Sequence, residues 1–110
     1  MTGAIELRRY VTRQGRDVFG RWLSGLKDAR TAAKILARVD RLAVGNFGDC
    51  KSLGSGLFEL RIDWGPGYRL YYAMIHRTCV LLLCGGDKGS QNSDIQRARD
   101  YLEDYRERTR

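Results

Sequence analysis

The sequence predicts one α+β domain whose helices and strands are segregated along the chain. Apolar and polar residues alternate over 57–75, which indicates strands, whereas apolar residues recur at helical spacing over 17–44 and over 92–105. A length of 110 residues fits a single domain, assigned to residues 1–110, that buries a modest core without disulfides. The expected order is strand, helix, helix, strand, strand, strand, helix, which indicates a layered α+β architecture.

The first part of the chain is predicted to hold a strand and a pair of helices. Residues 4–10 alternate loosely, as in a short strand, and from Asp17 the apolar residues take helical spacing. Asp28 has the side chain of an N-cap for a second helix over about 29–44. The apolar stripe of that helix consists of Ala32, Ile35, Leu36, Val39, Leu42 and Ala43. The short link between the two helices indicates a helical hairpin.

A row of basic residues lies on the opposite side of the second helix. It consists of Arg30, Lys34, Arg38 and Arg41. Charged residues on a helix usually face water, so a solvated face is the simplest interpretation. A stripe that contacts phosphate groups is the functional alternative, and the pattern leaves both open.

The chain is organised around residues 57–75, which follow a predicted loop over 45–56 and contain two strands joined by Gly-Pro-Gly at 65–67. Proline followed by glycine suits a type II turn, in which the second residue has a positive φ. Because side chains on a strand alternate between faces, one face is apolar and the other carries Arg61 and Arg69. Two guanidinium groups suit phosphate recognition. The alternative is an ordinary solvated face on which neighbouring carboxylates neutralise them.

One more strand and one more helix are predicted after the hairpin. The unbroken apolar run over 79–84 indicates a strand that is covered on both faces or central in the sheet. Residues 85–90 are predicted as a glycine-rich loop. Asn92 or Ser93 is predicted to cap the last helix.

The composition restricts the class of partner. Lys and Arg number 20 against 13 Asp and Glu, and the resulting net charge of +7 favours a polyanionic or acidic partner. No apolar run approaches the roughly 20 residues that span a bilayer, so no membrane partner is expected. The first residues lack the basic and apolar regions of a signal peptide, so a cytoplasmic protein is expected.

The few potential metal ligands argue against a metal site. With one histidine and no Cys-x-x-Cys spacing, a zinc site is not expected, and we expect no cofactor. Cys50, Cys79 and Cys84 are expected to be free thiols, the last in a buried strand. His76 falls in a predicted turn, where a surface residue is a simpler interpretation than a general base.

Three motifs resemble those of the addiction-module killer proteins, a HigB-like branch of the RelE/ParE toxin superfamily of type II toxin–antitoxin systems. They are Glu-Leu-Arg-Ile-Asp at 59–63, Gly-Pro-Gly-Tyr-Arg-Leu-Tyr-Tyr at 65–72, and Leu-Leu-Cys-Gly-Gly-Asp-Lys at 82–88. The helical segments match as well, so the resemblance covers about residues 4–100. Its most specific part is the hairpin together with the Cys-Gly-Gly-Asp-Lys segment.

The resemblance implies a RelE-like fold, in which an antiparallel sheet of about four strands packs on the N-terminal helical hairpin and a C-terminal helix follows. It implies a toxin that cleaves mRNA on the ribosome without a metal, by attack of a ribose 2′-hydroxyl on the adjacent phosphate. The implied partners are the ribosome, mRNA and a cognate antitoxin. DNA would be engaged only through the antitoxin complex.

The resemblance also implies roles for individual residues. Arg69 matches the arginine that family members use at the scissile phosphate, and Arg61 and Lys88 fall where members carry further basic residues. Such cations would stabilise the charge that develops on the phosphate. Lys51, Tyr71 and Arg38 are predicted to bind RNA, and Tyr71, which shares the strand face of Arg69, is predicted to stack on a base.

One position departs from the family pattern. RelE-like enzymes often carry a tyrosine or histidine after the last strand as an acid or base, whereas the nearest equivalent here is Asp94. The catalytic base is therefore not identified by the resemblance. Two alternatives stay open: a ParE-like, non-enzymatic inhibitor of DNA gyrase, and a basic nucleic-acid-binding module without toxicity.

Overall fold

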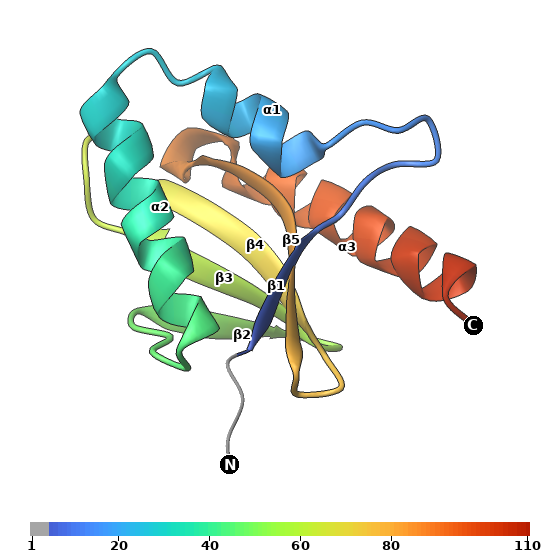
Figure 1. The fold of residues 1–110 in the computed structure, drawn as a ribbon. Helices are drawn as coiled ribbons and strands as arrows, with labels where there is room; N and C mark the ends of the chain where they lie inside the picture. The colour runs from blue at the N-terminus through green and yellow to red at the C-terminus, as the bar shows by residue number, and fades with distance from the viewer. Residues whose placement is uncertain (1–4) are drawn as a thin grey trace.

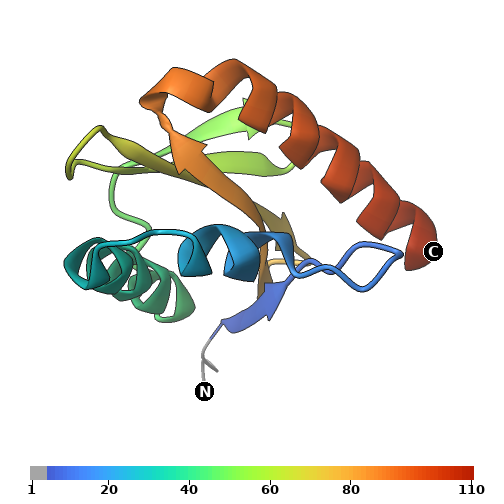
Figure 2. The same cartoon turned by 90° about the horizontal axis from the view of Figure 1, so that it is seen from above.

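A five-stranded sheet lies between two helical layers in the computed structural model, which describes residues 5–110 (Figures 1 and 2). The strands are β1 (Glu6–Arg9), β2 (Cys50–Gly54), β3 (Leu57–Ile62), β4 (Tyr68–Ile75) and β5 (Cys79–Asp87). The helices are α1 (Val18–Ser24), α2 (Ala29–Ala43) and α3 (Gln91–Arg108), and a short 3-10 turn, η1 (Lys88–Ser90), precedes α3. The predicted α+β class is confirmed, and the predicted elements follow one another in the predicted order with one further strand among them. Ala4, the first residue of the predicted strand, lies outside the described residues.

The sheet is mixed rather than antiparallel, and it has one strand more than predicted. Its order is β1-β5-β4-β3-β2, and β1 pairs with β5 in parallel while the other pairs are antiparallel. The additional strand, β2, falls within residues 45–56, which the sequence predicted as a loop. Ser55 and Gly56 join β2 to β3 with φ of 56° and 83°. Two consecutive positive φ values are typical of a tight hairpin turn. The sequence analysis assigned this Ser-Gly pair to a loop and therefore missed the turn.

The helical hairpin covers one face of the sheet, as the alternation in the central hairpin predicted (Figure 2). The core on this side is formed by Phe19, Ile35, Val39, Leu42, Leu60, Ile62, Leu70, Tyr72, Val80 and Leu82. The predicted N-cap of α2 is confirmed, since Asp28 accepts from the Arg30 amide at 3.0 Å. Asp17, which was not predicted as a cap, caps α1 by accepting from the Gly20 amide at 2.9 Å. One stripe residue of α2 differs from the prediction: Leu36 is 38% exposed.

α3 packs across the opposite face, so the sheet has helices on both sides (Figures 1 and 2). The core on this side is formed by Tyr10, Leu57, Tyr71, Ala73, Leu81, Leu83, Cys84, Ala98 and Leu102. The resemblance implied that the helices pack on one face of the sheet and leave the opposite face free, and α3 corrects this expectation by packing on that opposite face. A part of this face stays open near the N-terminus of α3, where the β3–β4 turn and the end of β5 meet.

β5 continues through residues that the sequence predicted as a glycine-rich loop. A Cβ atom at Gly85 would overlap the ring of Trp22, and one at Gly86 would overlap the carboxylate of Asp94. These glycines are therefore required by close packing against α1 and α3 rather than by a turn. The last helix consequently starts earlier than predicted, with Ser90 as its N-cap instead of Asn92 or Ser93.

The turn between β3 and β4 differs from the predicted type II turn. The Gly67 amide donates to the Trp64 carbonyl at 3.1 Å, which makes Gly65 and Pro66 the central residues. Gly65 takes a φ of 55° at the first central position, a value that only glycine adopts readily. Within residues 5–110, none of the helices combines the length and the apolar character that crossing a bilayer requires.

Candidate functional site

A cleft of about 380 Å³ opens where the β3–β4 turn meets the end of β5, and we call it the hairpin cleft. It is lined by Asp49, Arg61, Ile62, Asp63, Gly65, Pro66, Gly67, Tyr68, Arg69 and Lys88. All three residues that the resemblance implied to be catalytic, Arg61, Arg69 and Lys88, line it. The structure therefore brings together side chains that are up to 27 positions apart in the sequence.

Arg61 and Arg69 are direct cross-strand partners on β3 and β4. Like charges in that position repel each other because their Cβ atoms lie only about 5 Å apart. Strand alternation places both on the face opposite α1 and α2. A nearby anion is needed to hold two guanidinium groups so close together.

Glu59 supplies that anion from beneath the two arginines. Its carboxylate is fully buried, and its Oε1 accepts from Arg61 Nε at 3.2 Å and from Arg69 Nη1 at 3.4 Å. Its Oε2 accepts from Tyr71 Oη at 3.2 Å and from Gln91 Nε2 at 2.7 Å. Glu59 therefore connects the two arginines of the cleft to the first residue of α3.

Burial by itself would raise the pKa of Glu59, because a charged carboxylate loses its hydration. Hydrogen bonds from Gln91, Arg61 and Tyr71, together with the charge of Arg69, outweigh burial and hold the pKa below its ordinary value. Glu59 is thus ionised at neutral pH. It cancels part of the positive charge of the arginines while fixing their direction.

Both guanidinium groups keep hydrogen-bonding capacity for a ligand. The Arg61 side chain is 39% exposed, and among residues 5–110 its only side-chain partner is Glu59. The Arg69 side chain is 15% exposed, and its buried Nε has no partner in the part of the chain that the structure describes. A tetrahedral anion with several acceptor oxygens, such as a phosphate group, matches the exposed donors of these guanidinium groups.

Lys88 reaches the cleft from η1. Asp87 starts this turn and accepts from the amides of Gly89 at 2.8 Å and Ser90 at 3.2 Å. Asp87 is also the register partner of Tyr68, so Lys88 follows the strand end directly beside the β3–β4 turn. The third cation of the cleft is thereby held on a capped turn.

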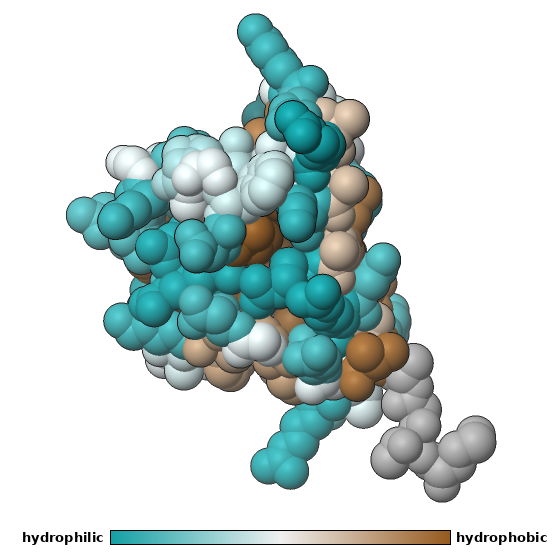
Figure 3. Space-filling model, turned by 90° about the vertical axis from the view of Figure 1, so that its left-hand side faces the viewer, coloured by the Kyte–Doolittle hydropathy of each residue, from teal (hydrophilic) through white to brown (hydrophobic). Residues whose placement is uncertain are grey.

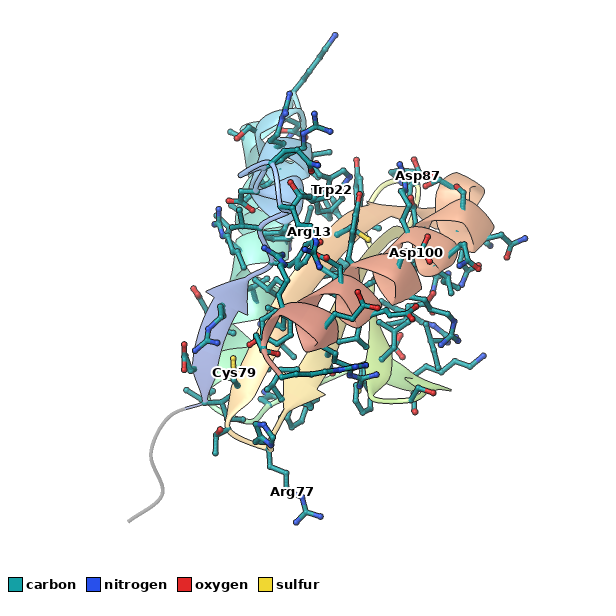
Figure 4. The ribbon with its side chains drawn as sticks, turned by 90° about the vertical axis from the view of Figure 1, so that its right-hand side faces the viewer. Arg13, Trp22, Arg77, Cys79, Asp87 and Asp100 are labelled. Carbon is teal, nitrogen blue, oxygen red and sulfur yellow. The ribbon has the colours of Figure 1, made fainter. Side chains whose placement is uncertain are left out.

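The side of the molecule that carries α2 and the β3–β4 turn is mostly hydrophilic, with small apolar areas between polar residues (Figure 3). Arg77, by contrast, projects into solvent from the β4–β5 turn, at the end of β5 opposite Asp87 (Figure 4). His76 is exposed on that same turn, as the sequence predicted. These two basic residues are therefore far from the hairpin cleft.

Comparison with known proteins identifies the family. The model of the family described as "Phage derived protein Gp49-like (DUF891)" matches residues 21–103. The chain belongs to this family. An uncharacterized protein of Haemophilus influenzae is 56% identical over 81 residues, which cover 74% of this chain and 82% of the relative.

Membership of the Gp49-like family is consistent with the toxin of a toxin–antitoxin system and implies a cognate antitoxin partner. The matched segment begins within α1 and includes β2 through most of α3. It therefore contains every residue that lines the hairpin cleft.

The residues implied to bind RNA are dispersed in this Gp49-like protein. Lys51 is exposed on β2 opposite Glu59, outside the cleft lining. Arg38, on α2, donates from Nη1 to the main-chain carbonyl of Arg61 at 3.0 Å. Tyr71 is fully buried, so its ring has no free face for stacking on a base, and burial raises its pKa.

Asp94 does not lie in the cleft, although the sequence made it the nearest equivalent of an acid or base. It is buried, and its carboxylate accepts from Ser90 Oγ and Arg97 Nη2, each at 2.5 Å. These contacts tie the first turn of α3 to η1. The carboxylate of Asp94 therefore holds the start of α3 in place and does not face the hairpin cleft.

Sequence reasoning missed three polar residues of the cleft. Asp49 and Asp63 line it, and the Asp49 carbonyl accepts from the Arg61 amide at 2.9 Å, which keeps residue 49 beside Arg61. Tyr68 lines it as well, with its ring edge toward Trp22 at a centroid distance of 6.2 Å. The only signal for Asp49 was its position just before an unrecognised strand. Among the described residues, no group of three or more His, Cys, Asp or Glu side chains is arranged to hold a metal ion.

Proposed function

We propose that this Gp49-like protein is the toxin of a type II toxin–antitoxin system and that it cleaves mRNA bound to the ribosome. The observation that supports the proposal is the convergence of Arg61, Arg69 and Lys88 on one cleft. An acidic segment of the antitoxin would neutralise the toxin by covering this positive surface. The protein would act in the cytoplasm, where its substrate is translated.

The proposed reaction is transfer of the phosphate to the neighbouring ribose. The 2′-oxygen forms a bond to phosphorus, and the bond to the 5′-oxygen of the next nucleotide breaks. The products are a 2′,3′-cyclic phosphate and a new 5′-hydroxyl, and the proton lost by the 2′-hydroxyl is balanced by the proton that the 5′-oxygen gains. No external oxidant or co-reactant is required.

In this reaction Arg61 and Arg69 would bind the non-bridging oxygens of the phosphate, whose negative charge grows in the transition state. Glu59 positions both groups from below and is not exposed to the substrate. Lys88 would stabilise the departing oxygen. Of the carboxylates in the cleft, Asp49 and Asp63 are the candidates to accept the proton of the 2′-hydroxyl.

Expression in a bacterial host without antitoxin, followed by mapping of mRNA 5′ ends, tests the proposal. The wild-type protein is expected to stop growth and to generate new 5′ ends within translated mRNA. Arg69→Ala should lower cleavage by about 100-fold or more, the usual effect of removing one donor that stabilises transition-state charge. Arg77→Ala, which removes an equal charge from the far turn, should leave cleavage unchanged.

Purified protein in a cell-free translation reaction gives the second measurement. Cleavage of the message that depends on ribosomes supports the proposal, and Asp49→Asn or Asp63→Asn should reduce its rate at neutral pH. Growth arrest with intact mRNA and loss of DNA supercoiling would instead support inhibition of gyrase. In that case Arg69→Ala would not change the mRNA pattern.

A further inference from the structure

A second groove of about 290 Å³ lies between α2 and the end of β3, and we call it the α2 groove. It is lined by Lys34, Ala37, Arg38, Arg41, Ile62, Asp63 and Trp64. Three of these side chains are cations, and Asp63 is the one carboxylate among the lining residues. The groove thus contains three of the four residues of the basic row that the sequence left open between a solvated face and a phosphate-binding stripe.

The α2 groove has an aromatic wall that is held in place. The indole Nε1 of Trp64 donates to Oγ1 of Thr31 at 3.0 Å, and Thr31 is itself buried. The ammonium of Lys34 lies 4.9 Å from the centroid of the indole ring. Cations that alternate with a fixed aromatic ring are typical of surfaces that bind unpaired nucleotides, because phosphates contact the cations and bases contact the ring.

The α2 groove is continuous with the hairpin cleft. Ile62 and Asp63 line both cavities. Arg38, whose side chain lines the groove, also donates to the main-chain carbonyl of Arg61, whose side chain lines the cleft. A polymeric ligand that leaves the hairpin cleft past Asp63 therefore enters the α2 groove directly.

The cations of the groove are available to a ligand. Lys34 and Arg41 are exposed, and neither forms an ion pair with any residue in the range 5–110. Arg38 is partly buried, with Nη1 bound to the Arg61 carbonyl and Nη2 buried, so it contributes its charge rather than open donors. Within the described part of the chain these cations lack ion-pair partners, and they lie beside an apolar and aromatic wall. A single strand of nucleic acid matches both features, because its phosphates contact cations and its bases stack on an aromatic ring. The carboxylates of an acidic peptide would contact the cations but would not stack on the ring.

We infer that the α2 groove binds the stretch of single-stranded RNA that flanks the nucleotide held in the hairpin cleft. The inference rests on the proposed function in taking RNA as the ligand. It assigns Lys34 and Arg41 to backbone phosphates and Trp64 to a base. The length of RNA that the protein recognises then exceeds what the hairpin cleft alone can hold.

Binding of the purified protein to fluorescent 2′-O-methyl RNA, which lacks the attacking hydroxyl, tests this inference. A short probe of about 3 nucleotides should occupy the cleft, and a long probe of about 12 should occupy the cleft and the groove. Lys34→Gln combined with Arg41→Gln should weaken binding of the long probe by roughly 10- to 30-fold at about 0.1 M salt. It should also reduce the slope of log affinity against log salt concentration by about 1.4, because each phosphate contact on a single strand contributes about 0.7 to that slope. Binding of the short probe should change by less than about twofold.

Arg16→Gln combined with Arg77→Gln is the matched control, since it removes two exposed charges from distant loops. An equal loss in both double variants, or an equal loss for short and long probes, would overturn the inference. So would groove variants that weaken binding of poly-glutamate but not of RNA, because an acidic protein segment would then be the occupant. Groove-dependent RNA binding in a protein that leaves cellular mRNA intact would contradict the proposed function and uphold this inference.

Discussion

Arg61 and Arg69 lie opposite each other on adjacent strands, and both donate to the same carboxylate oxygen of Glu59. The shared acceptor allows two like charges to occupy one cross-strand position. It also leaves the outer donors of both guanidinium groups directed at the hairpin cleft. The architecture of the cleft therefore depends on a residue that no ligand in the cleft contacts.

Glu59→Gln should destabilise the protein. A glutamine amide offers one acceptor oxygen where the carboxylate offers two, and its NH₂ group would face donors that have no other acceptor. Breaking a buried ion pair by removing one partner costs about 3–5 kcal/mol, and the partial exposure of Arg61 reduces this, so we expect a loss of about 2–4 kcal/mol. Denaturant unfolding of the two proteins gives the value.

Glu6→Gln provides the comparison for that variant. Glu6 also pairs with an arginine, Arg8, at 2.8 Å, but both side chains are about half exposed. Exposed pairs contribute little, so this substitution should change the free energy of unfolding by less than about 1 kcal/mol. Similar losses for Glu6→Gln and Glu59→Gln would contradict the central role of Glu59.

Stability should fall in acid through the protonation of Glu59. The pKa of Glu59 is lower in the folded protein than in the unfolded chain, so its contribution is complete above the unfolded value of 4.5. The contribution is lost as the pH falls from that value through the folded pKa. Asp104, whose pKa is lowered from an ordinary value of 3.8 by Tyr10 and Arg13, adds to the loss at a lower pH.

The free energy of unfolding measured from about pH 3 to pH 7 checks this pH dependence. The difference between wild type and Glu59→Gln isolates the contribution of residue 59, because Asp104 is present in both proteins. That difference should be constant near neutral pH and should shrink below about pH 4.5. A difference that stays constant to pH 3 would mean that Glu59 keeps an ordinary pKa.

The sequence predicted elements whose signals are local. Asp17 and Asp28 precede apolar stripes of helical period, and both prove to be N-caps. It failed at β2, whose residues carry little hydrophobic signal and are recognised only through pairing with β3. It also failed at Gly85 and Gly86, where the need for glycine comes from Trp22 and Asp94, distant in the sequence.

In the candidate site, too, the sequence predicted what depends on local pattern and missed what depends on contacts between distant segments. Alternation on β3 and β4 was enough to place Arg61 and Arg69 on one face. It did not reveal that α3 covers much of that face and buries Tyr71, because strand periodicity does not distinguish a covered face from an open one. One of the hydrogen bonds that hold the buried Glu59 likewise comes from Gln91, which follows it by 32 positions.

Gly86→Ala should test the tight packing of β5 against α3. The new methyl group would overlap the Asp94 carboxylate, which is buried and hydrogen-bonded to Ser90 and Arg97. Overpacking of this kind costs about 1–3 kcal/mol. Thermal unfolding should show a lower midpoint than wild type.

Gly25→Ala is the corresponding control. Gly25 ends α1 with a φ of −77°, and a Cβ there would make only ordinary contacts of 3.4 Å or more. Because alanine adopts this conformation and restricts the unfolded chain, the variant should be neutral or stabilised by up to about 1 kcal/mol. If Gly25→Ala lost as much stability as Gly86→Ala, a general intolerance of added volume would explain both.

Tyr10→Phe should loosen the C-terminal half of α3. The hydroxyl of Tyr10 donates to Asp104 at 2.5 Å, which links the residue after β1 to the helix, and burial together with this carboxylate raises the pKa of Tyr10 to about 12. Hydrogen bonds to charged groups contribute about 1.5–3 kcal/mol, and because Asp104 keeps ion pairs with two arginines, we expect a loss near the lower limit. Among residues 5–110, the hydroxyl that Tyr105→Phe removes accepts only from the exposed Arg8, so the effect should be below about 0.5 kcal/mol. Amide hydrogen exchange should accelerate around residues 100–108 in Tyr10→Phe and not in Tyr105→Phe, whereas equal exchange in the two variants would show that the contact between Tyr10 and Asp104 does not hold the helix.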